Sequence, residues 1–210
     1  MNKKYNELDI NCEYLLKSMK LTSNKIKNVA KSIEIEQVKK MIVSILNAKS
    51  IFVMGAGRSG LIGKAFAMRL MHLGFSVFVV GETTAPAVKK EDIVIAISGS
   101  GATHSITDMC KVVKDINADL ITVTSNRDSL LGNIADTTII IPGRDMAGTD
   151  LENCKEYDER HIRGEYAQLS PLGSSFEITT YVFLDSVVSE LMQILDSSEE
   201  DLKSRHTVLE

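Results

Sequence analysis

The chain has 210 residues, 44% of them hydrophobic, and a formal net charge of −4. Its length suits one globular domain with a substantial core, and its weakly acidic balance disfavours binding to nucleic acid. Cys12, Cys110 and Cys154 are widely spaced and form no C-x-x-C pair, so the sequence favours a reducing compartment over a disulfide framework or zinc site. With no membrane-length apolar run and a polar start, we expect a cytoplasmic protein.

Residues 1–47 are predicted to be helical. They contain no cluster of turn residues, and apolar side chains recur at helical spacing at Val38, Met41, Ile42, Ile45 and Leu46. We expect two or three helices that precede a sheet and pack over it or against a partner.

From residue 51 onward, short β-branched runs alternate with helical patterns. This alternation is typical of an α/β protein with a doubly wound, five-stranded parallel sheet, whose ligand lies beyond the carboxyl ends of the strands. The predicted strands are 51–54, 76–80, 93–97, 119–124 and 137–141, and the predicted helices between them are 59–73 and 103–116.

The last third of the chain begins with a charged stretch, 142–173, that has no apolar periodicity. A loop of this length inside a compact domain is often functional, and disorder is the alternative. A strong helix is predicted over 174–195, followed by a short polar helix in the tail, 199–210.

The glycine-rich loop Gly55-Ala56-Gly57-Arg58-Ser59-Gly60 follows the first predicted strand. It fits the dinucleotide pattern G-x-G-x-x-G, and Glu82 after the next strand is a candidate ribose ligand. The polar turn and the short remaining chain favour a smaller anion instead, held by Gly57, Ser59 and Arg58. A purely structural glycine turn is the third interpretation.

The second loop, Ser98-Gly99-Ser100-Gly101-Ala102-Thr103, follows the strand 93–97 directly. Ser98 and Thr103 are also common turn and helix-capping residues. Three hydroxyls separated by two glycines exceed what capping requires, however, and can surround an anion at a helix N-terminus. We therefore predict a phosphate site built by this loop together with Ser59.

These two loops resemble those of the SIS domain, the sugar-isomerase fold that binds phosphosugars. Further segments resemble the 6-phospho-3-hexuloisomerase family over nearly the whole chain, and these are 66–74, 80–84, 171–177 and 205–210. One departure from the family pattern is Ala102, which stands where an acidic residue is expected. The resemblance implies an N-terminal helical segment (1–47), an SIS domain (48–196) and a C-terminal tail (197–210).

The resemblance also implies an activity, the interconversion of 3-hexulose 6-phosphate and fructose 6-phosphate downstream of formaldehyde fixation. It implies a homotetramer whose active sites lie near subunit interfaces, with a sugar phosphate as the small-molecule partner and no membrane partner. The alternatives are an isomerase of the arabinose-5-phosphate type and a non-catalytic phosphosugar sensor. Because isomerisation through an enediol moves only protons, no cofactor is expected.

Glu177 is the candidate base. It begins the last strong helix on the same stripe as Tyr181, Leu184 and Val188, so its carboxylate should approach the sheet edge partly desolvated. Ser174-x-x-Glu177 also fits a capping box, in which the carboxylate serves the helix N-terminus instead. The resemblance favours catalysis, and Glu165 is the reserve base.

The four histidines have different predicted roles. His72 is expected to be a packed residue near a helix end, and His104 either contacts phosphate or is solvated. His161 matches no standard metal-ligand spacing, so no metal site is predicted. The resemblance gives His206 a catalytic role near the sugar oxygen, in its own or a neighbouring subunit.

Overall fold

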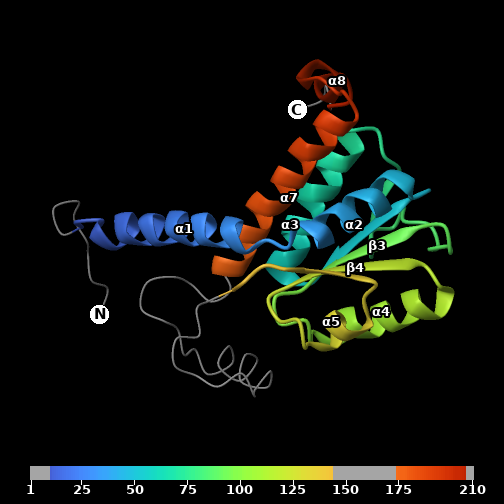
Figure 1. Ribbon diagram of the computed structural model, residues 1–210, viewed down its shortest axis with the longest axis horizontal. Helices are drawn as coiled ribbons and strands as arrows, with labels where there is room; N and C mark the ends of the chain where they lie inside the picture. The colour runs from blue at the N-terminus through green and yellow to red at the C-terminus, as the bar shows by residue number, and fades with distance from the viewer. Residues whose placement is uncertain (1–9, 144–173, 207–210) are drawn as a thin grey trace, which may run out of the picture.

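The computed structural model describes residues 10–143 and 174–206. Within them a parallel sheet is flanked by helices on both faces, as Figure 1 shows. The strands are β1 (Ile51–Gly55), β2 (Val77–Val79), β3 (Ile93–Ile97), β4 (Asp119–Thr124) and β5 (Thr137–Ile140). The helices are α1 (Glu13–Ser32), α2 (Ile35–Asn47), α3 (Gly57–His72), α4 (His104–Ile116), α5 (Leu130–Ile134), α7 (Ser174–Ile194) and α8 (Glu199–Ser204).

The sheet has the order β2-β1-β3-β4-β5, and every neighbouring pair is parallel. After β1 the chain runs to β2 on one side, and it then returns to place β3 on the other side. The strand order therefore reverses between β1 and β3, and at such a switch point the loops leave in opposite directions and open a crevice.

Two hydrophobic layers hold the sheet between the helices. Alternate strand residues face opposite sides: Ile51, Val53, Ile95 and Ile97 pack under α2, α3 and α7, whereas Phe52 and the other residues of opposite parity pack against α4. β3 is buried along its whole length because both of its faces are covered. The central strands therefore form a rigid base for the loops at their carboxyl ends.

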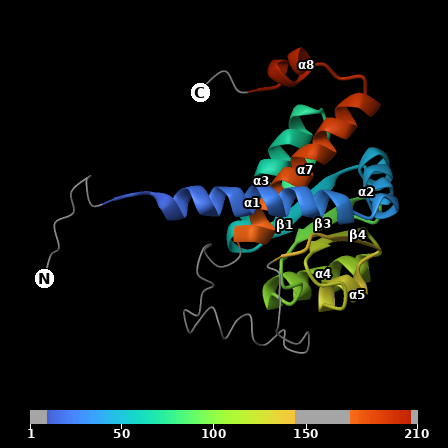
Figure 2. The same cartoon turned by 60° about the vertical axis from the view of Figure 1, so that its left-hand side comes forward.

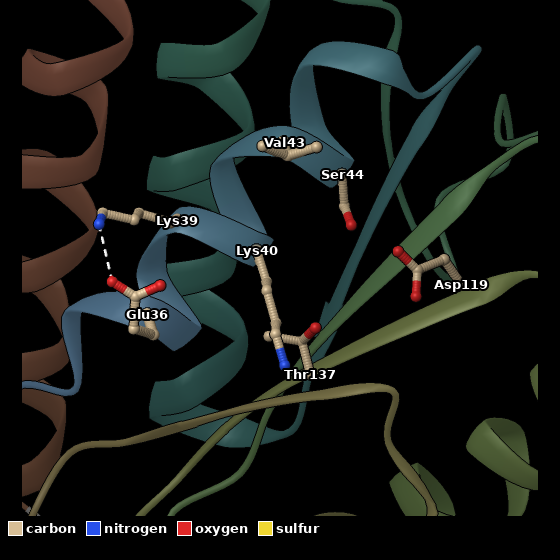
Figure 3. A pocket seen from close by; sticks show the side chains of 7 residues that line it. All are labelled: Glu36, Lys39, Lys40, Val43, Ser44, Asp119 and Thr137. Atoms are coloured by element: carbon tan, nitrogen blue, oxygen red, sulfur yellow. Dashed lines mark hydrogen bonds and ion pairs between the residues drawn. The ribbon is translucent and has the colours of Figure 1, made fainter.

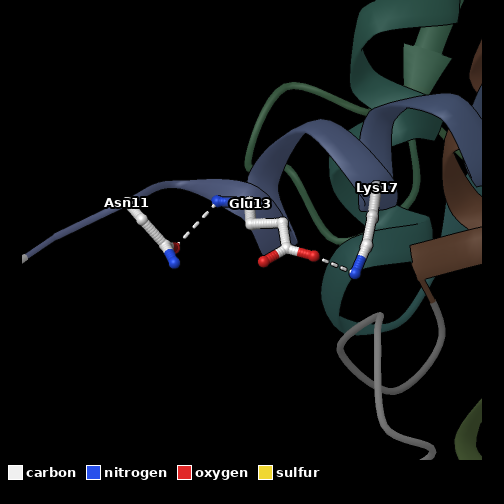
Figure 4. A network of polar contacts seen from close by, with 3 residues as sticks. All are labelled: Asn11, Glu13 and Lys17. Carbon is white, nitrogen blue, oxygen red and sulfur yellow. Dashed lines mark hydrogen bonds and ion pairs between the residues drawn. The ribbon is translucent and has the colours of Figure 1, made fainter.

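Helix α1 extends away from the body of the domain, as Figures 1 and 2 show from two directions. Its buried residue, Val29, lies near its end. At its start the Asn11 side chain accepts a hydrogen bond from the Glu13 N–H at 3.1 Å, and Glu13 pairs with Lys17, as drawn in Figure 4. Its outward residues include large apolar side chains that are more than half exposed: Tyr14, Leu15, Leu16, Met19 and Leu21.

The predicted α/β class and the five-stranded parallel sheet are confirmed, and the described part of the N-terminal segment, residues 10–47, contains two helices. The sequence did not reveal α5, whose five residues are too few to show helical periodicity; its signal was Ser129, which caps the helix by accepting from the Gly132 N–H. In the tail, α8 ends at Ser204. The predicted loop 142–173 lies almost entirely outside the described residues, and the division into three parts remains a prediction.

None of the helices in the described part of the chain combines the length and apolar character needed to cross a bilayer.

Candidate active site at the switch point

Both glycine-rich loops leave the sheet at the switch point, from adjacent strands. Gly55 at the end of β1 is the register partner of Ile97 at the end of β3, so the two loops begin side by side. The predicted convergence of the loops on one site is therefore what the strand order produces.

The β1–α3 loop is built by close backbone packing. A Cβ on Gly60 would lie 2.6 Å from the Gly55 carbonyl oxygen, so both positions need glycine for the helix to approach the strand. Gly57 has a φ of +56° in open space, and Ser59 is buried behind it. Arg58 follows as the second residue of α3, and its side chain is half exposed.

The β3–α4 loop is held by its own hydroxyls. Ser98 is buried, and its Oγ accepts from the Gly101 N–H and contacts the Thr103 hydroxyl, each at 3.2 Å. The Ser100 Oγ accepts from the Ala102 N–H at 3.2 Å. Ser98 thus performs the turn role that was the alternative interpretation, while Ser100 and Thr103 lie half-buried at the loop surface.

The helix that follows this loop leaves donors open. Thr103 occupies the N-cap position of α4, but its side chain makes no capping hydrogen bond, and the first turn contains no acidic residue. Among the described residues, no acceptor serves the N–H groups of His104 and Ser105. Helix α3 likewise has neither a side-chain cap nor an acid in its first turn. Two uncompensated helix N-termini at one crevice favour an anion.

Two glycines of the second loop fit against the protein beneath it. A Cβ on Gly101, whose φ is +62°, would lie 2.1 Å from the Ser129 Oγ. A Cβ on Gly99 would lie 3.1 Å from the Phe176 ring. Gly99 therefore allows the start of α7 to pack directly on the loop, which brings the next residue, Glu177, to the site.

Glu177 is a buried carboxylate with one charged neighbour among the described residues. Its side chain is 11% exposed, and the Arg58 Nε lies 3.1 Å from Oε2. This is a charge contact without hydrogen-bond geometry, because Oε2 is fully buried and has no hydrogen-bond partner. Burial raises the pKa of Glu177 above its ordinary value, and the Arg58 guanidinium opposes part of that rise.

The capping-box alternative for Glu177 receives no support from the helix start. Helix α7 begins at Ser174, which makes Ser174 the first helical residue and Glu177 the fourth, whereas a capping box requires Ser at the N-cap and Glu three residues later. The buried and unbonded Oε2 also differs from a carboxylate that serves a backbone N–H.

The structure does not bring His206 to Glu177 within one chain. The His206 ring lies 5.0 Å from the His72 ring, centroid to centroid, and the Arg205 guanidinium donates to the His72 carbonyl at 2.9 Å. His72 is the last residue of α3 and is buried, as predicted, whereas Arg58 is near the helix start. At 1.5 Å per residue, about 20 Å of helix separates the two ends.

The remaining candidates divide between the surface and the undescribed segment. His104 is exposed at the start of α4. Glu82, considered as a ribose ligand, is exposed and pairs with Lys64 at 2.5 Å. In the described ranges, no group of three His, Cys, Asp or Glu side chains could hold a metal ion. Glu165 and His161 lie outside the described residues.

A hollow of about 360 Å³ occurs elsewhere on the domain and is drawn in Figure 3. It lies between α2 and the first residues of β4 and β5, Asp119 and Thr137, and therefore at the amino end of the sheet. Its charged lining residues include both signs; those from α2 are exposed, with Glu36 held by Lys39 at 2.7 Å, and Asp119 is half-buried. Neither loop contributes to it, so it is a surface groove separate from the candidate site.

Sequence reasoning missed the contacts that join the parts of the site. Phe176 lies in the segment 171–177 that carries the family resemblance, but nothing in that pattern predicts its contact with Gly99. Nor does the sequence predict that the Gly99 carbonyl accepts a hydrogen bond from the Ser125 hydroxyl, at 2.6 Å. Arg58 and Glu177 were identified separately, and nothing in their spacing showed that they pair. Their only shared signal was that each lies near the start of a helix.

A parallel sheet with two glycine-rich loops at its switch point, one of them hydroxyl-rich, defines an α/β protein whose crevice favours a small anion. The chain matches the SIS domain over residues 44–152 and belongs to that family. Its sheet order, 2-1-3-4-5, also differs from the order 3-2-1-4-5-6 of the dinucleotide-binding fold considered for the first loop.

Relatives with and without an assigned activity are similar to this chain over most of their lengths. An uncharacterised protein of Archaeoglobus fulgidus is 45% identical, covering 93% of this chain and all of its own. The 3-hexulose-6-phosphate isomerase of Methanocaldococcus jannaschii is 40% identical, covering 79% of this chain and 80% of its own. A crystal structure from Methanococcus jannaschii, for which that isomerase function was inferred, has a TM-score of 0.75 at 36% identity, covering 92% and 99% of the two chains.

Proposed function

We propose that this protein is a phosphosugar isomerase that interconverts 3-hexulose 6-phosphate and fructose 6-phosphate, the step after formaldehyde fixation in the ribulose monophosphate pathway. The named relative supports an isomerase of sugar phosphates. The observation that carries the proposal is the buried, unbonded carboxylate of Glu177 beside an anion loop. A phosphosugar sensor would need the loop and not the carboxylate.

In this proposal the loops bind the phosphate group. The hydroxyls of Ser100 and Thr103 and the open N–H groups at the start of α4 donate to its oxygens. Ser98 fixes the shape of the loop, and Ser59 and Arg58 complete the site from α3. Gly57, Gly99 and Gly101 allow the backbone to follow this path.

Glu177 transfers the proton in this mechanism. Its carboxylate removes the proton from carbon 2 of the 3-hexulose, and the carbonyl oxygen at carbon 3 takes up a proton to give the 2,3-enediol. Return of the carbon-bound proton to carbon 3, with loss of the proton from the oxygen on carbon 2, gives fructose 6-phosphate. A desolvated carboxylate suits this step because its raised pKa lies closer to the operating pH.

We further propose that the chain works as a homotetramer, with its sites near subunit interfaces. The support is helix α1, which exposes five large apolar residues along a segment that extends beyond the domain body (Figures 1 and 2). In such an assembly His206, which is distant from its own Glu177, acts in a neighbouring site. Light scattering, which measures the mass of the assembly, should show a tetramer for the wild-type protein and a smaller species for a Leu15→Glu, Leu16→Glu variant. Mixing inactive Glu177→Gln subunits with inactive His206→Ala subunits tests the shared site, because mixed assemblies should recover activity.

Proton exchange in deuterium oxide tests the reaction itself. Purified protein incubated with fructose 6-phosphate should incorporate deuterium at carbon 3 of the substrate and at carbon 2 of the 3-hexulose product, followed by NMR. An aldose–ketose isomerase would instead exchange carbon 1. The same pattern separates the proposed reaction from its nearest enzymatic alternative.

The Glu177→Gln variant should lose the exchange, and Glu190→Gln should keep it. Glu190 lies on the same helix, exposed and away from the loops, and is the matched control. Absence of exchange in the wild-type protein would favour the sensor and would contradict the proposal.

A further inference from the structure

At the start of helix α3 the positive end of the helix macrodipole and the Arg58 side chain lie close together. Arg58 is the second residue of the helix, where the macrodipole already presents its positive end and a cation is unfavourably placed. The first turn contains no acidic residue and no side-chain cap. Glu177 is the described carboxylate that compensates Arg58, and it comes from a different helix.

The contact between Arg58 and Glu177 is weakly held on the arginine side. The Arg58 side chain is 51% exposed, whereas the carboxylate is buried, and the 3.1 Å approach of Nε to Oε2 lacks hydrogen-bond geometry. An arginine bound by charge alone can change partner without breaking a hydrogen bond. A phosphate dianion offers a guanidinium two parallel hydrogen bonds, which is a stronger arrangement.

We propose that Arg58 exchanges partners when a phosphosugar binds, leaving the Glu177 carboxylate for the phosphate group held by the second loop. This inference rests on the proposed function and assigns Arg58 as a positioning residue. In the free protein the Arg58 guanidinium opposes part of the rise that burial causes in the pKa of Glu177. In the complex the carboxylate loses its counter-charge beside the sugar and becomes the stronger base.

Other charges near Glu177 do not perform this role. On α3 the next arginine that reaches α7 is Arg69, whose Nε lies 3.6 Å from the Asp185 Oδ1, two turns beyond Glu177. Helix α1 also packs on α7 and carries Lys25, Lys27 and Lys31 in its second half. Burial raises the pKa of Glu177, and the Arg58 guanidinium is the charged group that opposes this rise.

The test follows the pKa of Glu177 directly, by the pH dependence of its side-chain carboxyl carbon signal in NMR, with and without inorganic phosphate. The Glu177→Gln variant assigns the signal. In the wild-type protein, phosphate should raise the pKa by about one pH unit, because a cation is withdrawn and an anion arrives. In Arg58→Gln the pKa should start higher, and phosphate should raise it by less than half as much.

Arg69→Gln is the matched control, since it removes an arginine of the same helix that pairs with a different carboxylate of α7. It should respond to phosphate as the wild-type protein does. Equal phosphate-induced changes in wild type and Arg58→Gln, or no response of the loop amides to phosphate, would overturn the inference. Isomerase turnover measured on the same samples tests the proposed function separately. If the wild-type protein is active but phosphate changes the pKa of Glu177 equally in wild type and Arg58→Gln, the proposed function stands and only the role of Arg58 is wrong.

Discussion

The two ends of the α3–α7 pair differ in how their polar groups are satisfied. At the loop end a buried carboxylate oxygen has no hydrogen-bond partner among the described residues, and two helices begin with neither a side-chain cap nor an acidic residue in the first turn. At the tail end Arg205 donates to the last carbonyl of α3, and the rings of His72 and His206 pack together. Because buried polar groups are normally paired, the unpaired end indicates ligand binding, whereas the polar groups of the tail end already have partners within their own chain.

The largest expected effect is at the loop end. Glu177→Gln should reduce kcat by about 10²–10⁴-fold, the usual contribution of a positioned base. Turnover measured with 3-hexulose 6-phosphate checks this, with Glu190→Gln as control. Near-normal turnover of Glu177→Gln would show that the carboxylate is not the base, and the contrast between the loop end and the tail end of the α3–α7 pair would then have no catalytic meaning.

The same variant tests the cost of the unpaired carboxylate. Burial raises the folded-state pKa of Glu177 above its unfolded value, so the folded protein binds the proton more tightly and loses stability as pH rises through the folded pKa. Glu177→Gln should therefore flatten the fall in urea midpoint that occurs between the unfolded and the folded pKa of Glu177. A parallel fall in both proteins would contradict the pKa direction.

The next effect separates two glycines that both have positive φ. Gly101→Ala should destabilise the protein by about 3 kcal/mol or more, because its methyl group would overlap Ser129 in addition to the backbone strain. Gly57→Ala meets open space and should cost about 1–2 kcal/mol. Urea unfolding of both variants measures the difference in stability. Equal losses of stability would show that backbone strain at positive φ, and not overlap with Ser129, accounts for the effect.

A smaller kinetic effect is expected from the loop hydroxyls. Ser100→Ala should raise KM by about tenfold with little change in kcat, since the phosphate contact is made equally in substrate and transition state. Steady-state kinetics provide the measurement. A fall in kcat at constant KM would instead place the hydroxyl in the chemical step.

The smallest effect is expected at the tail end. Arg205→Ala removes one hydrogen bond to the His72 carbonyl and should cost about 0.5–1.5 kcal/mol of stability. Thermal unfolding measures the loss, and kinetics on the same sample show whether the tail acts only within its own chain. A marked loss of turnover would support the proposed reach of His206 into a neighbouring site.

The sheet was predictable because hydrophobic periodicity is local and each strand has its own run of β-branched residues. The position of both glycine-rich loops was predictable for the same reason, since glycine and hydroxyl residues directly follow two of those runs. The pairing of Arg58 with Glu177, and the packing of Phe176 on Gly99, join segments more than 70 residues apart and depend on how α3 and α7 pack. Because no local sequence pattern specifies which distant segments pack together, these two contacts could be found only in the tertiary structure.

The contact between Gly99 and Phe176 also has a thermodynamic consequence. The residue that permits the fit belongs to the proposed phosphate loop, and the ring that fills it precedes Glu177, so the loop and the proposed base share one rigid support. Binding energy obtained at the phosphate can then be used to orient the carboxylate rather than to tighten the complex. A hexulose without its phosphate should accordingly lose catalytic rate as well as affinity.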